Sequence, residues 1–485
     1  MNVFKYLIFI IVIVCQPVLL VDAGTLSKRS AAPMPDLIAR HEALPEVGTD
    51  RIRGAGSLTG AGHGLDVFRN SMHLIVENYV EKISDRDLLK MVLDKLVLVV
   101  LPPCVEDIGK CSEDVDNCFV RDINSLSARC NLDVNRLLFT VLNMVVQDLD
   151  PNSCMMDAGM LKELEIGTTG KFGGVGMVVS AKKGDYVVVS PFGGSPAYKA
   201  GIRAGDTILQ IDGQPLHGLS LLQVLHRVRG PAGSSMSVKV IDSKSGSVRQ
   251  VQLRRRMIKI PPVRHLLLER RIGYLRIINF QEGTASEVRK ALGQFLAHGS
   301  RGLAGLILDL RDNPGGLFGE SIQVANLFKP SGILTSVRGR HSNLNRDFKA
   351  NGRTRVPQLP IVILINKGTA SASEILAGAL QGLPEVSVMG ERSFGKASVQ
   401  AVFPLGQGMA IRLTTAHYYT AEGRDIDGKG LEPDILIHDS DDSSTRGKIE
   451  LLDGEQLKND AGVKAALAYL RSGERPVHSP FSSWY

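Results

Sequence analysis

The sequence lacks several features that mark common functional classes. No dense run of Lys and Arg is interleaved with aromatic residues, so the formal net charge of +7 does not indicate a nucleic-acid-binding protein. No apolar run after residue 21 approaches the roughly 20 residues that span a bilayer. Neither the His-Glu-x-x-His motif of zinc proteases nor a Gly-x-Ser-x-Gly turn is present. With 485 residues, 44% of them hydrophobic, the chain is long enough for two to four globular domains.

Cysteine is absent after residue 154. The six cysteines are Cys15, Cys104, Cys111, Cys118, Cys130 and Cys154. Removal of a leader that contains Cys15 would leave an odd number, so at least one thiol would be free or would pair between chains. Disulfide bonds are the leading interpretation for an exported protein, although the sequence does not fix their connectivity. No Cys-x-x-Cys spacing or nearby His supports a metal site, and no metal is expected.

The N-terminus has the pattern of an export signal. Lys5 precedes an apolar run over residues 7–21, and small residues follow at 21–23. We therefore predict a signal peptide over residues 1–23, with an uncleaved anchor as the alternative. Val14 occupies the position where a lipoprotein signal requires a small residue, which argues against lipidation of Cys15. The predicted location is periplasmic or otherwise extracytoplasmic, and membrane association is left open.

Composition and periodicity divide the rest of the chain into five segments. These are a linker (24–65), a helical domain with a Cys-rich insertion (66–165), a module of short strands (166–260), an α/β unit (261–440) and a C-terminal helix with a tail (441–485). The strands predicted over 306–310 and 361–365 are continuous apolar runs, which is typical of strands that are buried on both faces. The fold class is therefore multidomain, combining α/β and α+β parts.

Residues 367–374 (Lys-Gly-Thr-Ala-Ser-Ala-Ser-Glu) follow one of these strands and open a helix. A serine at such a turn, Ser371, can present its hydroxyl to a cleft. The amides at the start of the helix, including that of Ala372, can stabilise an oxyanion. The competing interpretation is structural, because Ser371 and Glu374 also fit a capping box.

Residues 395–400 (Gly-Lys-Ala-Ser-Val-Gln) supply a candidate base. A solvent-exposed lysine is protonated at neutral pH, whereas a desolvated Lys396 could accept the proton of a serine. Gln400 lies four positions further on, on the same side of a strand, and could orient the lysine. An ordinary solvated lysine is the alternative, and His417 is a weaker candidate for the base.

Residues 306–316 (Leu-Ile-Leu-Asp-Leu-Arg-Asp-Asn-Pro-Gly-Gly) form a strand that ends in a tight turn. The amides of Gly315 and Gly316 could approach a ligand closely and complete an oxyanion hole.

A rival pattern, Gly-x-x-x-x-Gly-Lys, covers residues 390–396 and would indicate a phosphate loop. Ala397 lacks the hydroxyl that holds magnesium, and a strand rather than a helix is predicted to follow, so nucleotide binding is disfavoured.

Several motifs, in order along the chain, resemble those of the C-terminal processing peptidases, also called tail-specific proteases. The resemblance rests on residues 309–316, 368–374, 393–396 with Gln400, 413–416 and 430–434, and it covers roughly residues 66–88 and 135–470. The 25 positions between Ser371 and Lys396 fit the family. The resemblance implies a serine endopeptidase with a Ser–Lys dyad, an α/β core of the ClpP/crotonase type and no cofactor.

The same resemblance makes residues 167–257 a PDZ module. Gly174, Val175, Gly176 and Met177 match the loop whose amides bind a peptide carboxylate. A substrate tail would add a strand beside residues 177–179. The implied partners are proteins with exposed C-terminal tails. A homo-oligomer, an adaptor and attraction to membrane surfaces remain open.

The chain departs from the family at one place. A Cys-rich segment (104–130) separates the first helices from the turn that the family writes as Asp-Pro-His-Ser. Here residues 150–154 are Asp-Pro-Asn-Ser-Cys. We expect this turn not to touch the catalytic residues. A catalytically silent peptide-binding scaffold is the alternative function.

Overall fold

The computed structural model describes most of the chain after residue 60. It covers residues 61–99, 133–182, 184–269, 271–297, 302–354, 356, 359–437 and 454–472, together with residues 119, 121, 123, 125, 128 and 129. The predicted signal peptide, most of the predicted linker and every cysteine except Cys154 lie outside these residues. Cys154 is disulfide-bonded, which supports the interpretation of the cysteines as disulfide partners.

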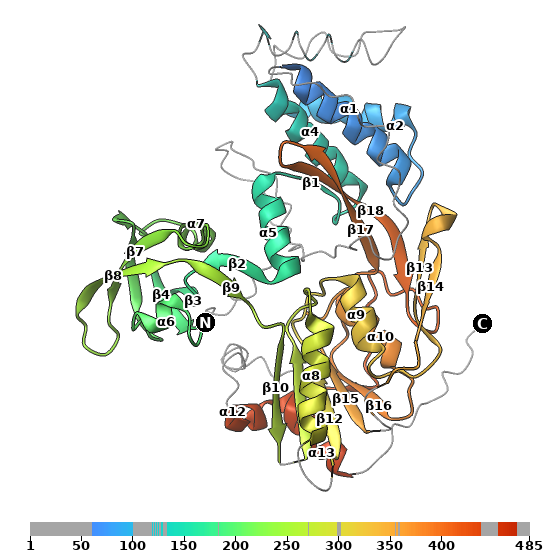
Figure 1. The fold of residues 1–485 in the computed structure, drawn as a ribbon. Coiled ribbons are helices and arrows are strands. Elements are labelled where there is room, and N and C mark those ends of the chain that lie inside the picture. The colour runs from blue at the N-terminus through green and yellow to red at the C-terminus, as the bar shows by residue number, and fades with distance from the viewer. Residues whose placement is uncertain are drawn as a thin grey trace.

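Three long helices pack together at the N-terminal end (Figure 1). They are α1 (Ala61–Asn78), α2 (Asp85–Val99) and α4 (Val134–Leu149). Leu88, Val92 and Leu96 of α2 repeat every four residues and are fully buried, as the amphipathic pattern requires. Helix α1 begins at Ala61, so the last five residues of the predicted linker, 61–65, are helical.

A module of short strands follows helix α5 (Ala158–Thr169). Its strands are β2 (Lys171–Gly174), β3 (Met177–Lys182), β4 (Asp185–Pro191), β5 (Thr207–Ile211), β6 (Gln214–Pro215), β7 (Ser235–Ile241), β8 (Val248–Arg254) and β9 (Arg256–Lys259), with helices α6 (Pro196–Lys199) and α7 (Leu221–Val228). The sheet order is β3-β4-β5-β7-β8, so β3 is an edge strand. The antiparallel pair β2–β9 connects the module to the rest of the chain (Figure 1).

The centre of the α/β core is a six-stranded sheet. Its order is β10 (Val263–Leu268), β11 (Ile272–Ile277), β12 (Gly305–Asp309), β15 (Ile361–Ile365), β16 (Val386–Gly390) and β19 (Ile435–Leu436), and all neighbours except β10–β11 are parallel. Every residue of β12 and β15 is buried, as the continuous apolar runs predict.

Helices cover both faces of this sheet. One face packs against α8 (Thr284–Ala297), α9 (Phe318–Ala325) and α10 (Ala372–Leu380). The other face packs against α13 (Ala461–Ser472), which follows the short helix α12 (Gly454–Asn459). The helix predicted for the C-terminal segment is therefore part of the core.

A second sheet connects the core to the N-terminal helices. It comprises β1 (Cys154–Met156), β13 (Ile333–Gly339), β14 (Arg346–Lys349), β17 (Ser398–Gly406) and β18 (Met409–Tyr419). The end of the long β17–β18 hairpin packs against the three helices through Leu405, Ile411 and Leu413. The strand that follows Lys396 is therefore buttressed by the helical domain.

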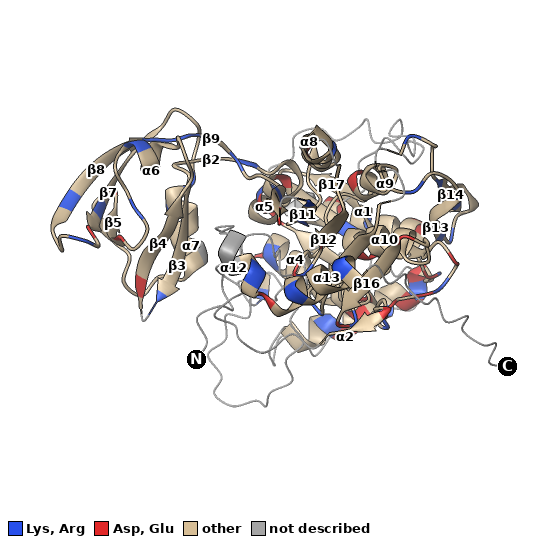
Figure 2. Cartoon of the chain, turned by 90° about the horizontal axis from the view of Figure 1, so that it is seen from below, with Lys and Arg blue, Asp and Glu red and all other residues tan. Residues whose placement is uncertain are grey.

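Charged residues of both signs are interspersed over the strand module and the core (Figure 2). Within the part of the chain that the structure describes, no helix combines the length and the apolar character needed to cross a membrane.

Candidate active site

The candidate nucleophile lies at a strained turn between a buried strand and a helix. Strand β15 ends at Ile365, and α10 begins at Ala372. Ser371 between them has φ 56° and ψ −116°, a conformation that non-glycine residues rarely adopt and that costs of order 1–3 kcal/mol. Its Oγ is buried and has no hydrogen-bond partner among the described residues. Ser371 and Glu374 have the arrangement of a capping box, in which the Glu374 carboxylate accepts a hydrogen bond from Ser371 N at 2.7 Å, whereas the Ser371 hydroxyl itself makes no described hydrogen bond.

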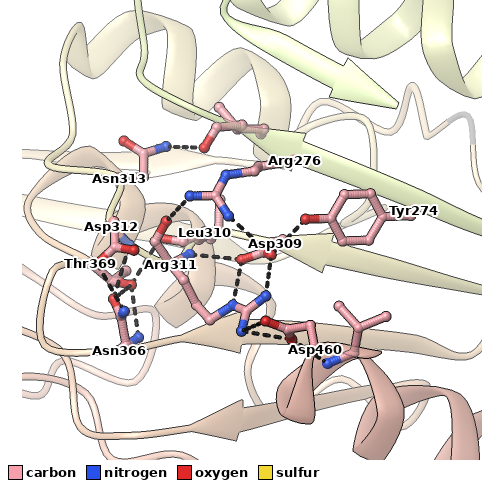
Figure 3. Close-up of polar contacts among 12 residues, drawn as sticks. Tyr274, Arg276, Asp309, Leu310, Arg311, Asp312, Asn313, Asn366, Thr369 and Asp460 are labelled. Carbon is pink, nitrogen blue, oxygen red and sulfur yellow. Dashed lines mark hydrogen bonds and ion pairs between the residues drawn. The ribbon is translucent and has the colours of Figure 1, made fainter. Parts of the chain in front are cut away.

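A second turn, residues 310–316, packs directly against this one (Figure 3). The side chain of Asn366 accepts from Asp312 N and donates to Asp312 Oδ1, and Thr369 Oγ1 donates to Leu310 O. Asn313 O accepts from Ala370 N and from Ser373 Oγ, on either side of the candidate nucleophile. These hydrogen bonds hold the two turns in one geometry although they are far apart in the sequence.

The two glycines of the second turn differ in what their amides do. A Cβ on Gly315 would lie 2.9 Å from Ser371 Cβ and 3.0 Å from Ala372 N, so glycine is required for this close approach. Gly315 N already donates to Asn313 Oδ1. The amides of Gly316 and Ala372 donate to no described residue. Asn313 therefore binds the N–H of Gly315, one of the two glycines expected to supply an oxyanion donor, and Gly316 is the glycine whose amide is available.

Lys396 lies at the end of a loop, but it is only 2% exposed and is therefore shielded from solvent. Burial lowers the pKa of Lys396 well below its ordinary value, the Arg412 guanidinium lowers it further, and Asp427 raises it. The alternative of a solvated lysine is therefore excluded. No helix follows Gly390–Lys396, since strand β17 begins at Ser398, and this excludes the phosphate-loop geometry.

Two buried side chains join the serine turn to the lysine segment. The Glu374 carboxylate accepts from Ser371 N and Lys396 N through Oε2, at 2.7 and 2.9 Å, and from Gly395 N and Ser393 Oγ through Oε1. Tyr418 Oη lies 3.1 Å from Ser371 O and 2.5 Å from Lys396 O. The sequence pattern indicated Glu374 only as a capping residue, and nothing in the pattern of β18 pointed to Tyr418.

Gln400 is completely buried on β17. Its Nε2 donates to Ser398 Oγ at 2.8 Å and to Thr414 Oγ1 at 3.3 Å, whereas Oε1 has no partner among the described residues. The strand bulges between Val399 and Gln400, and Lys396 precedes the strand. Simple alternation along a strand therefore does not explain which way Gln400 faces.

Asp309 and Arg311, from the Asp-Leu-Arg part of the motif, belong to a buried network of hydrogen bonds and ion pairs and do not position the amides of the turn directly (Figure 3). Asp309 accepts from Tyr274 Oη at 2.7 Å and forms a two-pronged pair with Arg311, whose guanidinium also binds Asp460 at the start of α13. Burial alone would raise the pKa of Asp309, but Arg311 and Arg276 lower it below its usual range. No local pattern indicated that Asp460, 149 positions after Arg311, completes this network.

The predicted peptide-binding loop lies beside the free edge of β3. Val175 O and Gly176 O accept from Ala197 N and Phe192 N, and Ser195 Oγ also donates to Gly176 O. The amides of Val175 and Gly176 donate to no described residue. Helix α7 lies close to β3, which is an edge strand of the sheet. Gly174 pairs with β9, and Met177 pairs with β4.

The structure also tests the remaining candidates. His417 is paired with Ser398 and Arg338 on neighbouring strands and makes no described contact with Ser371. No group of three or more His, Cys, Asp and Glu side chains in the described ranges is arranged to hold a metal ion.

Two family models and several known proteins match parts of this chain. A model of peptidase family S41 matches residues 271–437, and a PDZ domain model matches residues 187–242. The carboxy-terminal-processing protease of Bartonella bacilliformis is 40% identical over 306 residues, which are 63% of this chain and 70% of that protein. Carboxy-terminal processing protease CtpB of Bacillus subtilis is 32% identical over 377 residues, 76% of this chain and 75% of that protein. A solved structure, the photosystem II D1 C-terminal processing protease, is 28% identical with a TM-score of 0.46, covering 79% of this chain and 94% of its own.

Proposed function

Because this chain belongs to the carboxy-terminal processing proteases of peptidase family S41, and is thus a serine-type peptidase, we propose that it cleaves near protein C-termini with a Ser371–Lys396 dyad. The observation that carries the proposal is the joint anchoring of the two residues. One carboxylate, Glu374, accepts from the backbone amides of both, and both side chains are almost completely buried.

The proposed reaction is acyl transfer in two halves. Neutral Lys396 accepts the proton of Ser371, and Oγ attacks the scissile carbonyl carbon to form a tetrahedral intermediate. The amides of Ala372 and Gly316 bind its oxyanion. Protonated Lys396 then gives the proton to the departing amine as the C–N bond breaks. Water hydrolyses the acyl-enzyme with Lys396 again acting as base.

The environment of Lys396 supports its role as a base. Burial and the Arg412 charge favour the neutral amine, which is the form that can accept a proton at neutral pH. Gln400 Oε1, a buried acceptor without a described partner, is the group that we assign to the lysine ammonium after the proton moves.

Recognition of the substrate tail is assigned to the PDZ module. The amides of Val175 and Gly176 are suited to a terminal carboxylate, and the open edge of β3 can pair with the residues before it. A tail bound there would add one strand to the sheet. Main-chain hydrogen bonds would supply affinity, whereas side chains of α7, which lies close to β3, would select among tails.

An oxidising compartment outside the cytoplasm is the proposed place of action. The proposal rests on the predicted signal peptide and on the disulfide bond of Cys154.

Turnover of an unfolded protein with an apolar C-terminal tail tests this function. Ser371→Ala and Lys396→Ala are expected to lose at least about a thousandfold in kcat/KM, since each removes one half of the dyad. Arg392→Ala, at a largely exposed position of the loop that leads to Lys396, is the matched control and should cleave normally. Equal turnover by wild type and Ser371→Ala would reject the assignment. Tail binding without cleavage by any form would favour the scaffold function.

A further inference from the structure

The turn at residues 150–153 reaches the surroundings of Gln400 through two hydroxyl groups. Asn152 Nδ2 donates to Ser398 Oγ at 3.0 Å, and Thr414 Oγ1 donates to Asp150 Oδ1 at 3.0 Å. Ser398 and Thr414 are the two groups to which Gln400 donates. The turn makes no described contact with Gln400 itself, as the sequence led us to expect, but Ser398 and Thr414 alone separate the two.

We propose that this turn, which ends the last helix of the N-terminal domain, is a positioning element that fixes which end of the Gln400 amide faces the dyad. The inference rests on the proposed role of Gln400 as the hydrogen-bond partner of Lys396. It assigns to Asp150 and Asn152 a function in the reaction, although neither would touch the substrate.

The direction of each hydrogen bond follows from the chemistry of the groups. A carboxylate accepts hydrogen bonds only, so the single hydroxyl hydrogen of Thr414 is committed to Asp150. Thr414 Oγ1 can then only accept from Gln400, and an amide nitrogen is the only part of Gln400 that donates. The NH2 group must therefore face Thr414 and Ser398, which leaves Oε1 as the acceptor for the lysine.

Asp150 is itself held rigidly. Its Oδ1 accepts from Asn152 N at 2.7 Å and Ser153 N at 3.1 Å, and its Oδ2 accepts from Ser153 Oγ at 2.6 Å. Ser153 Oγ in turn accepts from Thr414 N at 3.0 Å. These bonds determine the rotamer of Asp150 and tie the turn to β18, so the carboxylate cannot rotate away from Thr414 without losing several partners.

The helical domain contributes to the same arrangement. Asp150 is the C-cap of α4, and Val80, just after α1, donates its N–H to Thr414 O at 2.8 Å. The three helices and the end of the β17–β18 hairpin share one hydrophobic cluster. The orientation of Gln400 thus depends on how this domain docks against the core, and not on the catalytic core alone.

A double-mutant cycle on the full-length protein tests the inference. Thr414→Val is expected to lower kcat about three- to tenfold with little change in KM, the range for loss of one orienting hydrogen bond. Because the lysine ammonium loses its acceptor when Gln400 turns, the acidic limb of the kcat/KM profile should move to lower pH. In a Gln400→Leu background the same substitution should have no further effect on kcat.

Two variants control for damage to the strand. Thr415→Val changes the neighbouring buried hydroxyl of β18, which lies 3.5 Å from Val399 O and outside this network, and should leave kcat unchanged. Thr414→Ser keeps the hydroxyl and should restore turnover. If Thr414→Val does not fold, Asn152→Ala at the partly exposed turn tests the same network. This variant is expected to lower kcat about threefold, and in a Gln400→Leu background it should have no further effect on kcat.

The outcomes separate this inference from the proposed function. Equal losses from Thr414→Val with and without Gln400 would overturn the positioning role, as would wild-type kinetics of Thr414→Val and Asn152→Ala. Ser371→Ala would remain inactive in both cases. Cleavage by Ser371→Ala would instead overturn the dyad itself.

Discussion

At the scale of single residues, the site depends on side chains that hold the backbone of the proposed dyad. The strained Ser371 backbone persists because its N–H is bound by a carboxylate buried beside it. Burial raises the pKa of Glu374, and the hydrogen bonds from Ser393, Lys396, Ser371 and Gly395 oppose that change. One buried carboxylate thus stabilises the strained turn and sets where the lysine segment lies.

The charges near Lys396 lead to a prediction about pH. Asp427 Oδ1 accepts from Ala397 N at 2.9 Å, and the negative charge of Asp427 raises the pKa of Lys396. The variant Asp427→Asn keeps an acceptor for Ala397 but removes this charge, so the pKa of the lysine should fall. Activity requires the neutral amine, and the acidic limb of kcat/KM against pH should therefore move to lower pH.

Asp425→Asn is the matched control for this experiment. Asp425 lies in the same exposed loop, pairs with Lys429 at 2.8 Å, and makes no described contact with the lysine segment. The acidic limb of kcat/KM against pH for Asp425→Asn should coincide with that of the wild type. A limb that moves to higher pH in Asp427→Asn would contradict the electrostatic argument.

At the scale of secondary structure elements, the C-terminal helix α13 is fixed to the α/β core by a buried ion pair. Asp460 accepts from Arg311 at 2.9 and 3.2 Å and also from Val463 N, so it caps the helix while it neutralises a guanidinium. Val463, Ala466 and Leu467 of the helix pack on the sheet. Arg311 in turn binds Asp309, at the strand end that leads to the turn containing Gly316.

Loss of Asp460 should destabilise the protein strongly. Asp460→Ala leaves a buried guanidinium with one of its carboxylate partners missing and removes a helix cap. We expect the free energy of unfolding to fall by about 3–5 kcal/mol, measured by chemical denaturation. Glu269→Ala removes a partner of Arg471 from the exposed, C-terminal end of the same helix, where an ion pair contributes less than about 1 kcal/mol. Similar losses of unfolding free energy in the two variants would show that the buried ion pair of Asp460 contributes no more than an exposed one.

At the scale of the whole molecule, recognition and cleavage are assigned to different modules. The PDZ module is joined to the core through the β2–β9 ribbon, and Arg229 after α7 bonds to Glu163 of α5. The residues of the proposed dyad belong to the core, where Glu374 binds the backbone amides of both. Under the proposed function, a substrate would meet the strand module and the cleavage site at separate points along its chain.

This separation predicts which kinetic constant depends on the substrate's terminus. Converting the C-terminal carboxylate of an unfolded substrate to an amide should raise KM about tenfold or more, because charge-assisted hydrogen bonds to the amides of Val175 and Gly176 are lost. The kcat should change little, since the dyad is untouched. An internal Asp-to-Asn change in the same substrate controls for net charge. An unchanged KM for the amidated substrate would contradict tail capture by this loop.

Local patterns in the sequence were sufficient to predict the elements that carry the site. The buried strands over 306–310 and 361–365, the helix after Ser371 and the strand after Ala397 follow from apolar runs and alternation, because burial on one or both faces dictates those patterns. Hydrogen-bond partners could not be predicted from such patterns. The sequence offered Gly315 and Gly316 alike as oxyanion donors, and only the structure shows that Asn313 binds the N–H of Gly315.

The sequence by itself determined the order of the modules, the candidate serine and lysine, and the glycines that a tight turn needs, since each of these is a property of neighbouring residues. Only the tertiary structure decided that Glu374 and Tyr418 join the two candidate segments, that Asp460 neutralises Arg311, and that the turn at Asp150 binds the hydroxyl groups to which Gln400 donates. These contacts join residues between three and 264 positions apart, and at the larger separations they form only once several elements have packed together. No local pattern encodes such a partnership, because a buried polar group specifies that it needs a partner but not which part of the chain will supply it.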